Sequence, residues 1–252
     1  MRKKIFIANW KMNHTVEESL KFITLFQKKI SLPQGVEVVI CPPYTSLHPL
    51  SIVFSENPSV KLGAQNCHFE DHGAYTGEIS PLFLKELNCE YVLLGHSERR
   101  QIFGETNELV SKKMKSAFWH HLTPVLCVGE TKKERSEGKT LDVIFNQLNE
   151  AYKNVMRDDL PRSIIAYEPV WAIGTGEAAT PIQAEEVQRE IRKWLEKSFG
   201  SAVSSQIHIL YGGSVTPQNI MELANQPNVD GALVGGASLT VDSFLKIVSV
   251  FK

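Results

Sequence analysis

The chain has 252 residues, 42% of them hydrophobic, and its formal net charge is -1, from 27 Lys and Arg against 28 Asp and Glu. This length is close to the roughly 250 residues typical of one barrel of alternating strands and helices, so we expect one domain over residues 1–252. The balanced charge, without a long run of one sign, argues against nucleic acid and against a membrane as partners.

The start of the chain is basic and then apolar. Polar Asn9 and Lys11 interrupt this start before the core of a signal peptide or a membrane span is complete, which predicts a cytoplasmic protein. The four cysteines have no Cys-x-x-Cys spacing and mostly adjoin apolar runs, so we expect reduced thiols in or near the core. They are Cys41, Cys67, Cys89 and Cys127.

Short apolar runs rich in Val, Ile and Leu recur along the chain. In chain order they span residues 5–8, 36–41, 62–64, 91–94, 125–128, 164–167, 207–211 and 232–234. Continuous runs are typical of parallel strands covered on both faces, and amphipathic helical stretches separate most of them. Eight such strands alternating with eight helices can close on themselves, so we predict an α/β fold with a closed parallel barrel. An open doubly wound sheet would usually need fewer strands or a second domain.

Several predicted helices begin with their own capping residues. Three segments fit the capping box, in which a hydroxyl and a side-chain acceptor satisfy free backbone amides. They are Thr15 with Glu18, Thr131 with Glu134 and Thr180 with Gln183. Proline at the first helical position is expected at three starts. These are Ser80-Pro81, Thr180-Pro181 and Thr216-Pro217.

Unusual polar residues follow directly after the apolar runs. They are Asn9 and Lys11 after the first run, Gly95-His96-Ser97-Glu98 after the fourth, Glu168 after the sixth, Gly212-Gly213-Ser214 after the seventh and Gly235-Gly236 after the eighth. In a parallel barrel all of them lie at one rim, where barrel active sites are found. Taken singly, such residues are more often a hydrogen-bonded core histidine, a solvated lysine or a tight turn; their shared location favours a functional site.

The sixth run ends in a carboxylate followed by a proline. Pro169 cannot donate to a sheet ladder, so it ends the strand and leaves Glu168 at the tip. Residues 170–176 then carry Trp171, for which we expect no polar partner, and two glycines, of which Gly174 is the first. This segment suits a loop that closes over a ligand, and equally a plain surface loop.

The glycine pairs after the last two runs suit a phosphate group, because a backbone without side chains lets amide donors converge on anionic oxygens. Gly174 would add one more amide. With Glu168 as base, His96 as hydrogen-bond donor and Lys11 as a fixed positive charge, the pattern predicts proton abstraction beside the carbonyl of a small phosphorylated molecule. That reaction requires no cofactor and no metal.

One other segment has a spacing seen in metal sites. His68 and His72 are four residues apart, which brings two ligands together only on a helix. This segment follows a strand and runs into Gly73, so we expect no metal there.

Six ordered blocks resemble the triosephosphate isomerase family. They are Ala8 to Asn13, Gly95 to Arg100, Cys127 to Glu130, Tyr167 to Gly176, Tyr211 to Ser214 and Leu233 to Ser238. The match runs almost end to end, and six blocks at predicted strand tips are specific where a single block would not be. The resemblance implies a (β/α)8 TIM barrel, a homodimer, and interconversion of dihydroxyacetone phosphate and D-glyceraldehyde 3-phosphate through an ene-diolate, in glycolysis and gluconeogenesis.

The resemblance also implies roles for the polar residues at the rim. Glu168 moves the proton between carbons, His96 polarises the carbonyl oxygen, Lys11 offsets substrate charge and Asn9 orients the substrate by hydrogen bonding. The backbone contacts to phosphate fall on Gly174, Ser214, Gly235 and Gly236.

Two residues next to His96 are expected to support it. Ser97 and Glu98 open a predicted helix, whose free amide donors disfavour an imidazolium at His96. We expect Glu98 to form an ion pair with a basic neighbour rather than to transfer protons.

The loop over residues 68–78 is implied to reach into a second subunit. Its aromatic, glycine-bearing tip, Tyr75, Thr76 and Gly77, suits an interface, with Thr76 bracing the partner's Asn9 and the partner's Lys11. The chain departs from many relatives at the far end of the segment after Glu168, residues 177–179, which read Glu-Ala-Ala where a basic residue is common. This departure bears on how the loop closes and not on the chemistry.

Two other functions fit the same architecture. A sugar-phosphate aldolase acting through a Schiff base would need a lysine at a mid-barrel strand tip, and none stands there. A catalytically silent barrel that binds phosphorylated metabolites or proteins would be expected to lose Glu168 or His96, and both are retained.

Overall fold

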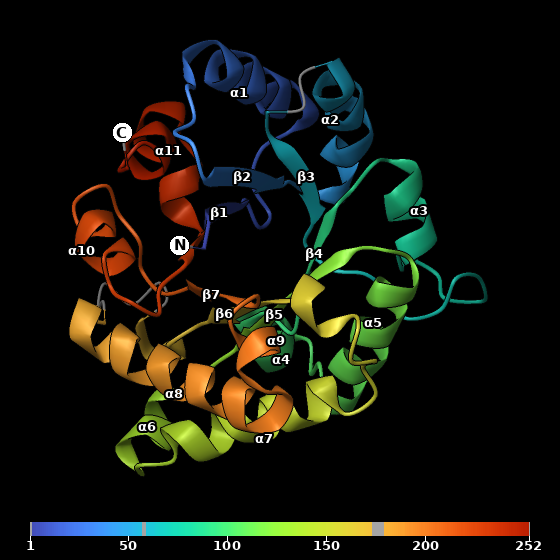
Figure 1. The fold of residues 1–252 in the computed structure, drawn as a ribbon. Helices are drawn as coiled ribbons and strands as arrows, with labels where there is room; N and C mark the ends of the chain where they lie inside the picture. Colours follow the sequence, from blue (N-terminus) through green and yellow to red (C-terminus); the bar gives the residue numbers. More distant parts are fainter. Residues whose placement is uncertain (1, 57–58, 173–178, 252) are drawn as a thin grey trace.

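The computed structural model describes residues 2–56, 59–172 and 179–251. Its eight strands form one closed parallel barrel in which each strand pairs with the next and the last pairs with the first (Figure 1). The strands are β1 (Lys4–Asn9), β2 (Val36–Cys41), β3 (Lys61–Ala64), β4 (Tyr91–Leu94), β5 (Thr123–Val128), β6 (Ile164–Tyr167), β7 (His208–Tyr211) and β8 (Gly231–Val234). Every strand coincides with a predicted apolar run to within two residues, so the prediction of a closed barrel is confirmed.

Helices surround the barrel on its outside (Figure 1). The α-helices are α1 (Val16–Lys29), α2 (Tyr44–Glu56), α3 (Pro81–Glu86), α4 (Ser97–Ile102), α5 (Asn107–Trp119), α6 (Lys132–Ser136), α7 (Thr140–Tyr152), α8 (Pro181–Phe199), α9 (Ser201–Ser204), α10 (Ile220–Ala224) and α11 (Val241–Val248). Short 3₁₀ turns are η1 (Leu160–Arg162), η2 (Val170–Ala172) and η3 (Gly236–Ser238). Over the described ranges, no helix has both the length and the apolar character needed to cross a membrane.

Three connections hold two α-helices each, so the prediction of one helix per connection was wrong there. They follow β4, β5 and β6. In each of them a glycine with positive φ separates the two helices: Gly104 (68°), Gly138 (70°) and Gly200 (89°). Glycine adopts this left-handed conformation without steric cost, and the conformation ends a helix.

The helix starts follow the predicted capping pattern closely. All three predicted capping boxes are present, at α1, α6 and α8. Pro81 and Pro181 occupy the predicted starts of α3 and α8. The prediction for Pro217 was wrong, because α10 begins later, at Ile220. Thr216 and Asn219 instead bond reciprocally across a turn that contains the proline.

The core has two layers, and the strands serve both. Along β1, Ile5 and Ile7 belong to the cluster inside the barrel, whereas Phe6 and Ala8 pack in the layer between the barrel and its helices. Because each strand is covered on both faces, its sequence reads as a continuous apolar run. The four cysteines are all buried and free, as predicted.

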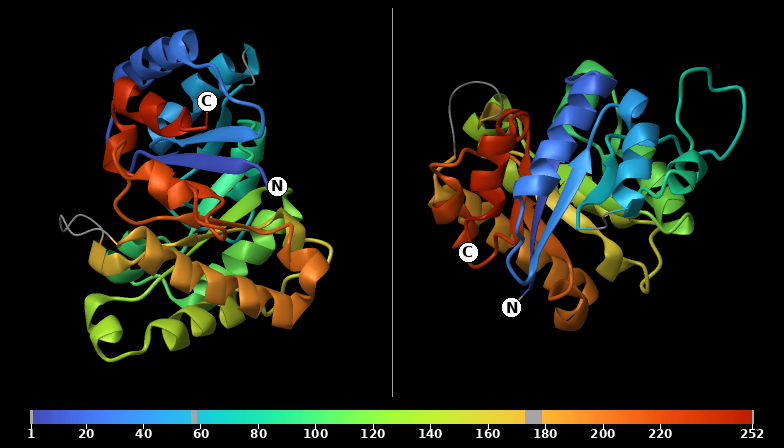
Figure 2. Two further views of the ribbon diagram at one scale, coloured as in Figure 1. Left: turned by 60° about the vertical axis from the view of Figure 1, so that its left-hand side comes forward. Right: turned by 90° about the horizontal axis from the view of Figure 1, so that it is seen from above.

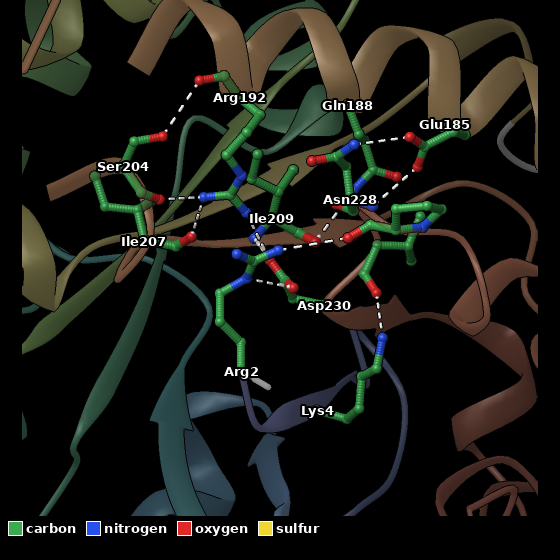
Figure 3. Close-up of polar contacts among 12 residues, drawn as sticks. Arg2, Lys4, Glu185, Gln188, Arg192, Ser204, Ile207, Ile209, Asn228 and Asp230 are labelled. Atoms are coloured by element: carbon green, nitrogen blue, oxygen red, sulfur yellow. Dashed lines mark hydrogen bonds and ion pairs between the residues drawn. The ribbon is translucent and has the colours of Figure 1, made fainter. Parts of the chain in front are cut away.

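A polar cluster ties the last strands to the first at the amino-terminal end of the barrel (Figure 3). Asp230, just before β8, accepts a hydrogen bond from Arg2 Nε at 2.7 Å and from Arg192 Nη2, in α8, at 2.7 Å. It also accepts from the backbone amide of Ile209 in β7 at 2.9 Å. One buried carboxylate therefore joins the start of the chain, α8 and two strands.

Candidate active site

The predicted rim residues converge on one cavity of about 320 Å³ at the carboxyl ends of the strands. Its lining includes Asn9, Lys11, His96, Glu168, Ser214, Gly235 and Gly236. Parallel strands of a closed barrel all end at the same rim, so residues far apart in sequence meet there. Gly174, the remaining candidate phosphate contact, lies outside the described residues.

His96 uses its two ring nitrogens for two different partners. Its Nδ1 accepts a hydrogen bond from the backbone amide of Glu98 at 3.2 Å, which makes His96 the capping residue of α4. Its Nε2 lies 3.0 Å from Oε1 of Glu168. A ring with its hydrogen on Nε2 satisfies both contacts, and this tautomer is inferred from the hydrogen-bond network.

The two groups shift each other's pKa. Burial is the largest single cause and lowers the pKa of His96, but the charge and hydrogen bond of the Glu168 carboxylate, together with the charge of Glu98, raise it by more, so the pKa lies above its ordinary value. Burial raises the pKa of Glu168, but the His96 ring, the Ser97 amide and Lys11 together lower it by more. The sequence predicted that the helix start would keep His96 neutral. The amide contact is present, but the neighbouring carboxylates outweigh it.

Glu168 is buried and closely packed. Its side chain is 2% exposed, and Oε2 accepts the backbone amide of Ser97 at 2.9 Å. Two glycines make room for it. A Cβ on Gly212 would lie 2.8 Å from Glu168 Cγ, and a Cβ on Gly129 would lie 1.8 Å from the Glu168 carbonyl oxygen. Any other residue at these two positions would push Glu168 out of place.

Lys11 is held in an uncommon backbone conformation. Its φ is 52°, which costs a non-glycine residue on the order of 1 kcal/mol. The Asn9 side chain accepts its amide at 3.1 Å, and Gln65 donates to its carbonyl at 2.8 Å. Its Nζ lies 2.7 Å from Oε1 of Glu98, so Glu98 does form an ion pair, with Lys11 as partner.

Gln65 was missed in the sequence. The signal that would have found it is its position directly after the apolar residues of β3, the same rule that singled out Asn9 directly after the apolar residues of β1.

The glycine turns form the other end of the cavity. Gly235 precedes the 3₁₀ turn η3, and the first amides of such a turn have no partner within it. A Cβ on Gly235 would lie 3.4 Å from Cε of Lys11, so the lysine reaches this end of the cavity. Free amides beside an ammonium group suit an anion.

The segment after Glu168 differs from the prediction at Trp171. Its indole N–H donates to Oε1 of Glu130 at 3.0 Å, so the expectation that Trp171 has no polar partner was wrong. The same oxygen accepts from Tyr167 at 3.2 Å and from Arg135 at 3.1 Å. Glu130 is fully buried. The sequence pattern predicted no role for it. Residues 173–178, which include the rest of the predicted lid and Glu177, are not among those described.

The loop after β3 stands out from the body of the barrel (Figure 2, right). Residues 72–78 are all exposed, and the ring of Tyr75 packs against His68 with 4.3 Å between centroids. His68 and His72 do not lie on a helix. In the part of the chain that is described, no group of three or more His, Cys, Asp or Glu is arranged to hold a metal ion.

The architecture defines a class of protein. A closed parallel barrel that gathers a carboxylate, an imidazole and an ammonium group around a cavity at the carboxyl ends of its strands is the arrangement of a barrel enzyme.

Comparison with known proteins identifies the family. The sequence model of the family described as triosephosphate isomerase matches residues 4–251. The chain is 50% identical over 248 residues to triosephosphate isomerase of Dictyoglomus turgidum, covering 98% of this chain and 99% of that protein. It is 52% identical over 251 residues to that of Dictyoglomus thermophilum, covering 98% and 99%, and 48% identical over 249 residues to that of Thermoanaerobacter pseudethanolicus, covering 99% and 100%. The chain belongs to the triosephosphate isomerase family.

Proposed function

We propose that this chain, as one catalytic domain over residues 1–252, interconverts dihydroxyacetone phosphate and D-glyceraldehyde 3-phosphate in glycolysis and gluconeogenesis. The observation that carries the proposal is the pairing of Glu168 with His96, 3.0 Å apart, on the cavity that also holds Lys11 and the glycine turns. This pairing supports the proposal because proton transfer beside the carbonyl of a phosphorylated substrate needs a base, a hydrogen-bond donor and an anion site around one cavity.

Glu168 takes a proton from the carbon next to the carbonyl group. His96 donates a hydrogen bond from Nε2 to the carbonyl oxygen, where negative charge builds, and Lys11 offsets that charge. Glu168 then returns the proton to the neighbouring carbon, while the hydroxyl proton on the first carbon passes to the former carbonyl oxygen by way of the His96 ring. One proton has then moved between the carbons and one between the oxygens, so none is gained or lost. For this to happen the bond between His96 and Glu168 must open, so that both groups face the substrate. Once the carboxylate moves away, the cause that raises the pKa of His96 weakens, and burial favours the neutral ring.

The phosphate group is bound at the other end of the cavity. The backbone amides of Ser214, Gly235 and Gly236 donate to its oxygens. The resemblance to the family adds the amide of Gly174, which lies outside the described residues. Asn9 and Lys11 line the same cavity and orient the substrate. Ser97 and Glu98 hold Glu168 and Lys11 from behind, through the 2.9 Å and 2.7 Å contacts.

We also propose a cytoplasmic homodimer. Support comes from the exposed loop 72–78 and from Met12, which is 96% exposed beside Lys11 although apolar. A second copy that received Tyr75, Thr76 and Gly77 next to its own β1 rim would cover such a residue.

The geometry argues against an aldolase that uses a Schiff base. A Schiff base needs a neutral amine, whereas the amine of Lys11 is engaged by a carboxylate oxygen at 2.7 Å. Lys11 therefore acts through its charge and not as a nucleophile.

Replacing Glu168 with Gln tests the assigned base. In a coupled assay of triose phosphate interconversion, E168Q is expected to lose about 1000-fold or more in kcat, because the amide cannot accept the proton. Inorganic phosphate should still bind, and at a pH above the folded pKa of His96, where the pair no longer stabilises the fold, the thermal unfolding midpoint should stay close to that of wild type. The control is Glu185→Gln, which alters a carboxylate bonded to Asn228, far from the cavity. Full turnover by E168Q would refute the base, and a wild-type protein that binds phosphate without turnover would be a silent barrel.

A further inference from the structure

Two charged side chains form hydrogen bonds with the backbone of Gly95, the residue that precedes His96. The Gly95 amide donates to Oε2 of Glu105 at 3.1 Å, and its carbonyl accepts from Nε of Arg100 at 2.6 Å. The carbonyl of Gly95 belongs to the same peptide group as the nitrogen of His96. The guanidinium of Arg100 therefore fixes the peptide plane from which the imidazole of His96 extends.

The same guanidinium reaches a second strand end. Its Nη2 donates to the carbonyl of Cys127 in β5 at 3.2 Å, and its Nη1 donates to Asn107 at the start of α5 at 2.6 Å. The next residue of β5, Val128, accepts the backbone amide of Glu168 at 2.8 Å. Arg100 thus spans the strand end that carries His96 and the strand end that seats Glu168.

The local sequence is built around this contact. Gly95 has a φ of 69°, and a Cβ there would lie 2.6 Å from Nη2 of Arg100. Glu105, 2% exposed, is itself paired with the buried ammonium of Lys113, which also donates to Asn66 at 2.8 Å. The Glu105 carboxylate that binds the Gly95 amide is therefore part of a buried hydrogen-bond network, and networks in which every member has a partner are rigid.

From these contacts we propose that Arg100 is a positioning residue for the isomerisation, which holds the imidazole of His96 in register with Glu168 without touching the substrate. The inference rests on the proposed function of His96 and Glu168. A guanidinium supplies several N–H donors in one fixed plane, whereas the ammonium of lysine is a single point and cannot bridge the same three acceptors. Without the planar guanidinium of Arg100, His96 and Glu168 are both still present, but the His96 imidazole is displaced relative to the Glu168 carboxylate.

A cavity next to Arg100 makes a direct test possible. It has a volume of about 310 Å³ and is lined by Gly95, Arg100, Glu105, Asn107 and Glu168 among others. A free guanidinium ion is small enough to enter such a space. An Arg100→Ala variant leaves the acceptors of the lost side chain in place, so that an added guanidinium ion can occupy their plane.

The expected result for Arg100→Ala is a fall of about 100-fold in kcat with little change in KM, because a misplacement of roughly 1 Å costs that much. Millimolar guanidinium chloride, far below denaturing concentrations, should restore at least about 10-fold of the loss, and sodium chloride at equal ionic strength should not. Arg192→Ala is the matched control. It removes another guanidinium that binds backbone carbonyls, those of Ser204 and of Ile207, at the opposite end of the barrel, and should keep its kcat.

The outcomes separate this proposal from the function on which it rests. A wild-type protein without isomerase activity overturns the function. An active wild type, with Arg100→Ala no slower than Arg192→Ala, overturns the positioning role alone, and so does a slow Arg100→Ala variant that guanidinium does not rescue.

If Arg100→Ala does not fold, Arg100→Lys serves in its place, because it keeps the charge and removes the plane. It should lower kcat by about 10-fold or more and shift the ¹⁵N signals of the His96 ring. Wild-type values for both would contradict the proposal.

Discussion

The ring of His96 lies between a backbone amide on one side and a carboxylate on the other. The Glu98 amide needs an unprotonated Nδ1, while Glu168 favours a proton on Nε2. Glu98 and Lys11, which also face the ring, act in opposite directions on its pKa. The charge on His96 is therefore set chiefly by burial against Glu168, and in the proposed mechanism Glu168 is the group that moves.

In E168Q the pKa of His96 is expected to change direction. Wild-type His96 should titrate above its ordinary value, because Glu168 and Glu98 together outweigh burial, and in E168Q it should titrate below that value, because burial, the largest single cause, then dominates. Titration of the ring ¹⁵N signals between about pH 5 and 9 measures both values. Equal pKa values in the two proteins would contradict the coupling.

The coupling between His96 and Glu168 also makes the unfolding free energy depend on pH. The folded-state pKa of His96 is raised above its unfolded value. The stabilisation from the pair is thus fully present below the unfolded pKa and is lost as the pH rises through the folded pKa. The difference in unfolding free energy between wild type and E168Q should shrink over that window.

At the scale of elements, most of the site residues lie in short connections that follow the strands. The loop after β3 protrudes from the barrel (Figure 2). It is pre-shaped by contacts within itself. Gly73 has a φ of 146°, and a Cβ there would lie 2.6 Å from the ring of Tyr75. A loop that keeps its shape while fully exposed suits docking into a preformed surface.

Thr76→Arg is expected to break the proposed dimer, because a long charged side chain at the loop tip cannot enter a close-packed interface. Sedimentation should give the mass of one chain where wild type gives that of two. Activity should fall at least about 10-fold, because strand-tip groups beside the active site lose their brace. Thr24→Arg, on the exposed face of α1, is the control and should leave both unchanged. A wild-type protein that sediments as one chain would end the dimer proposal.

For the molecule as a whole, closure of the barrel depends on joining its two ends. The β1–β8 pairing is reinforced by Asp230, which is 3% exposed and bonded to Arg2, 228 positions away in sequence. The carboxylate lies at the amino-terminal end of the strands, opposite the rim that holds Glu168. Stability and catalysis are thereby concentrated at opposite ends of the barrel, as is common in this architecture.

Asp230→Asn should lower the unfolding free energy by about 3 kcal/mol, because it leaves two guanidinium groups without their buried counter-charge. The kcat of the folded fraction should not change. Urea unfolding followed by circular dichroism, with the coupled assay in parallel, measures both. The control Asp242→Asn removes an exposed carboxylate paired with Lys29 and should leave the midpoint in place. A midpoint shift for Asp230→Asn no larger than that of the control would contradict the closure role.

Much of the fold and of the candidate site was determined by the sequence alone, because the signals are local. Continuous apolar runs mark strands buried on both faces, and capping boxes such as Thr15 with Glu18 mark helix starts. Pro169 marked the end of the sixth strand, with Glu168 directly after its last residue, and the placement of Asn9 and His96 after their runs located the rim.

The tertiary structure decided what depends on long-range contacts. Three sets of hydrogen bonds join segments that no local pattern relates. They are those of Arg100 and Glu105 with Gly95, of Trp171 with Glu130, and of Gln65 with Lys11. The pKa of His96 belongs to this group as well, because its direction depends on burial and on a carboxylate 72 positions further along the chain. Local preferences are summed over neighbours in sequence, whereas burial and charge pairing are settled only when distant segments meet.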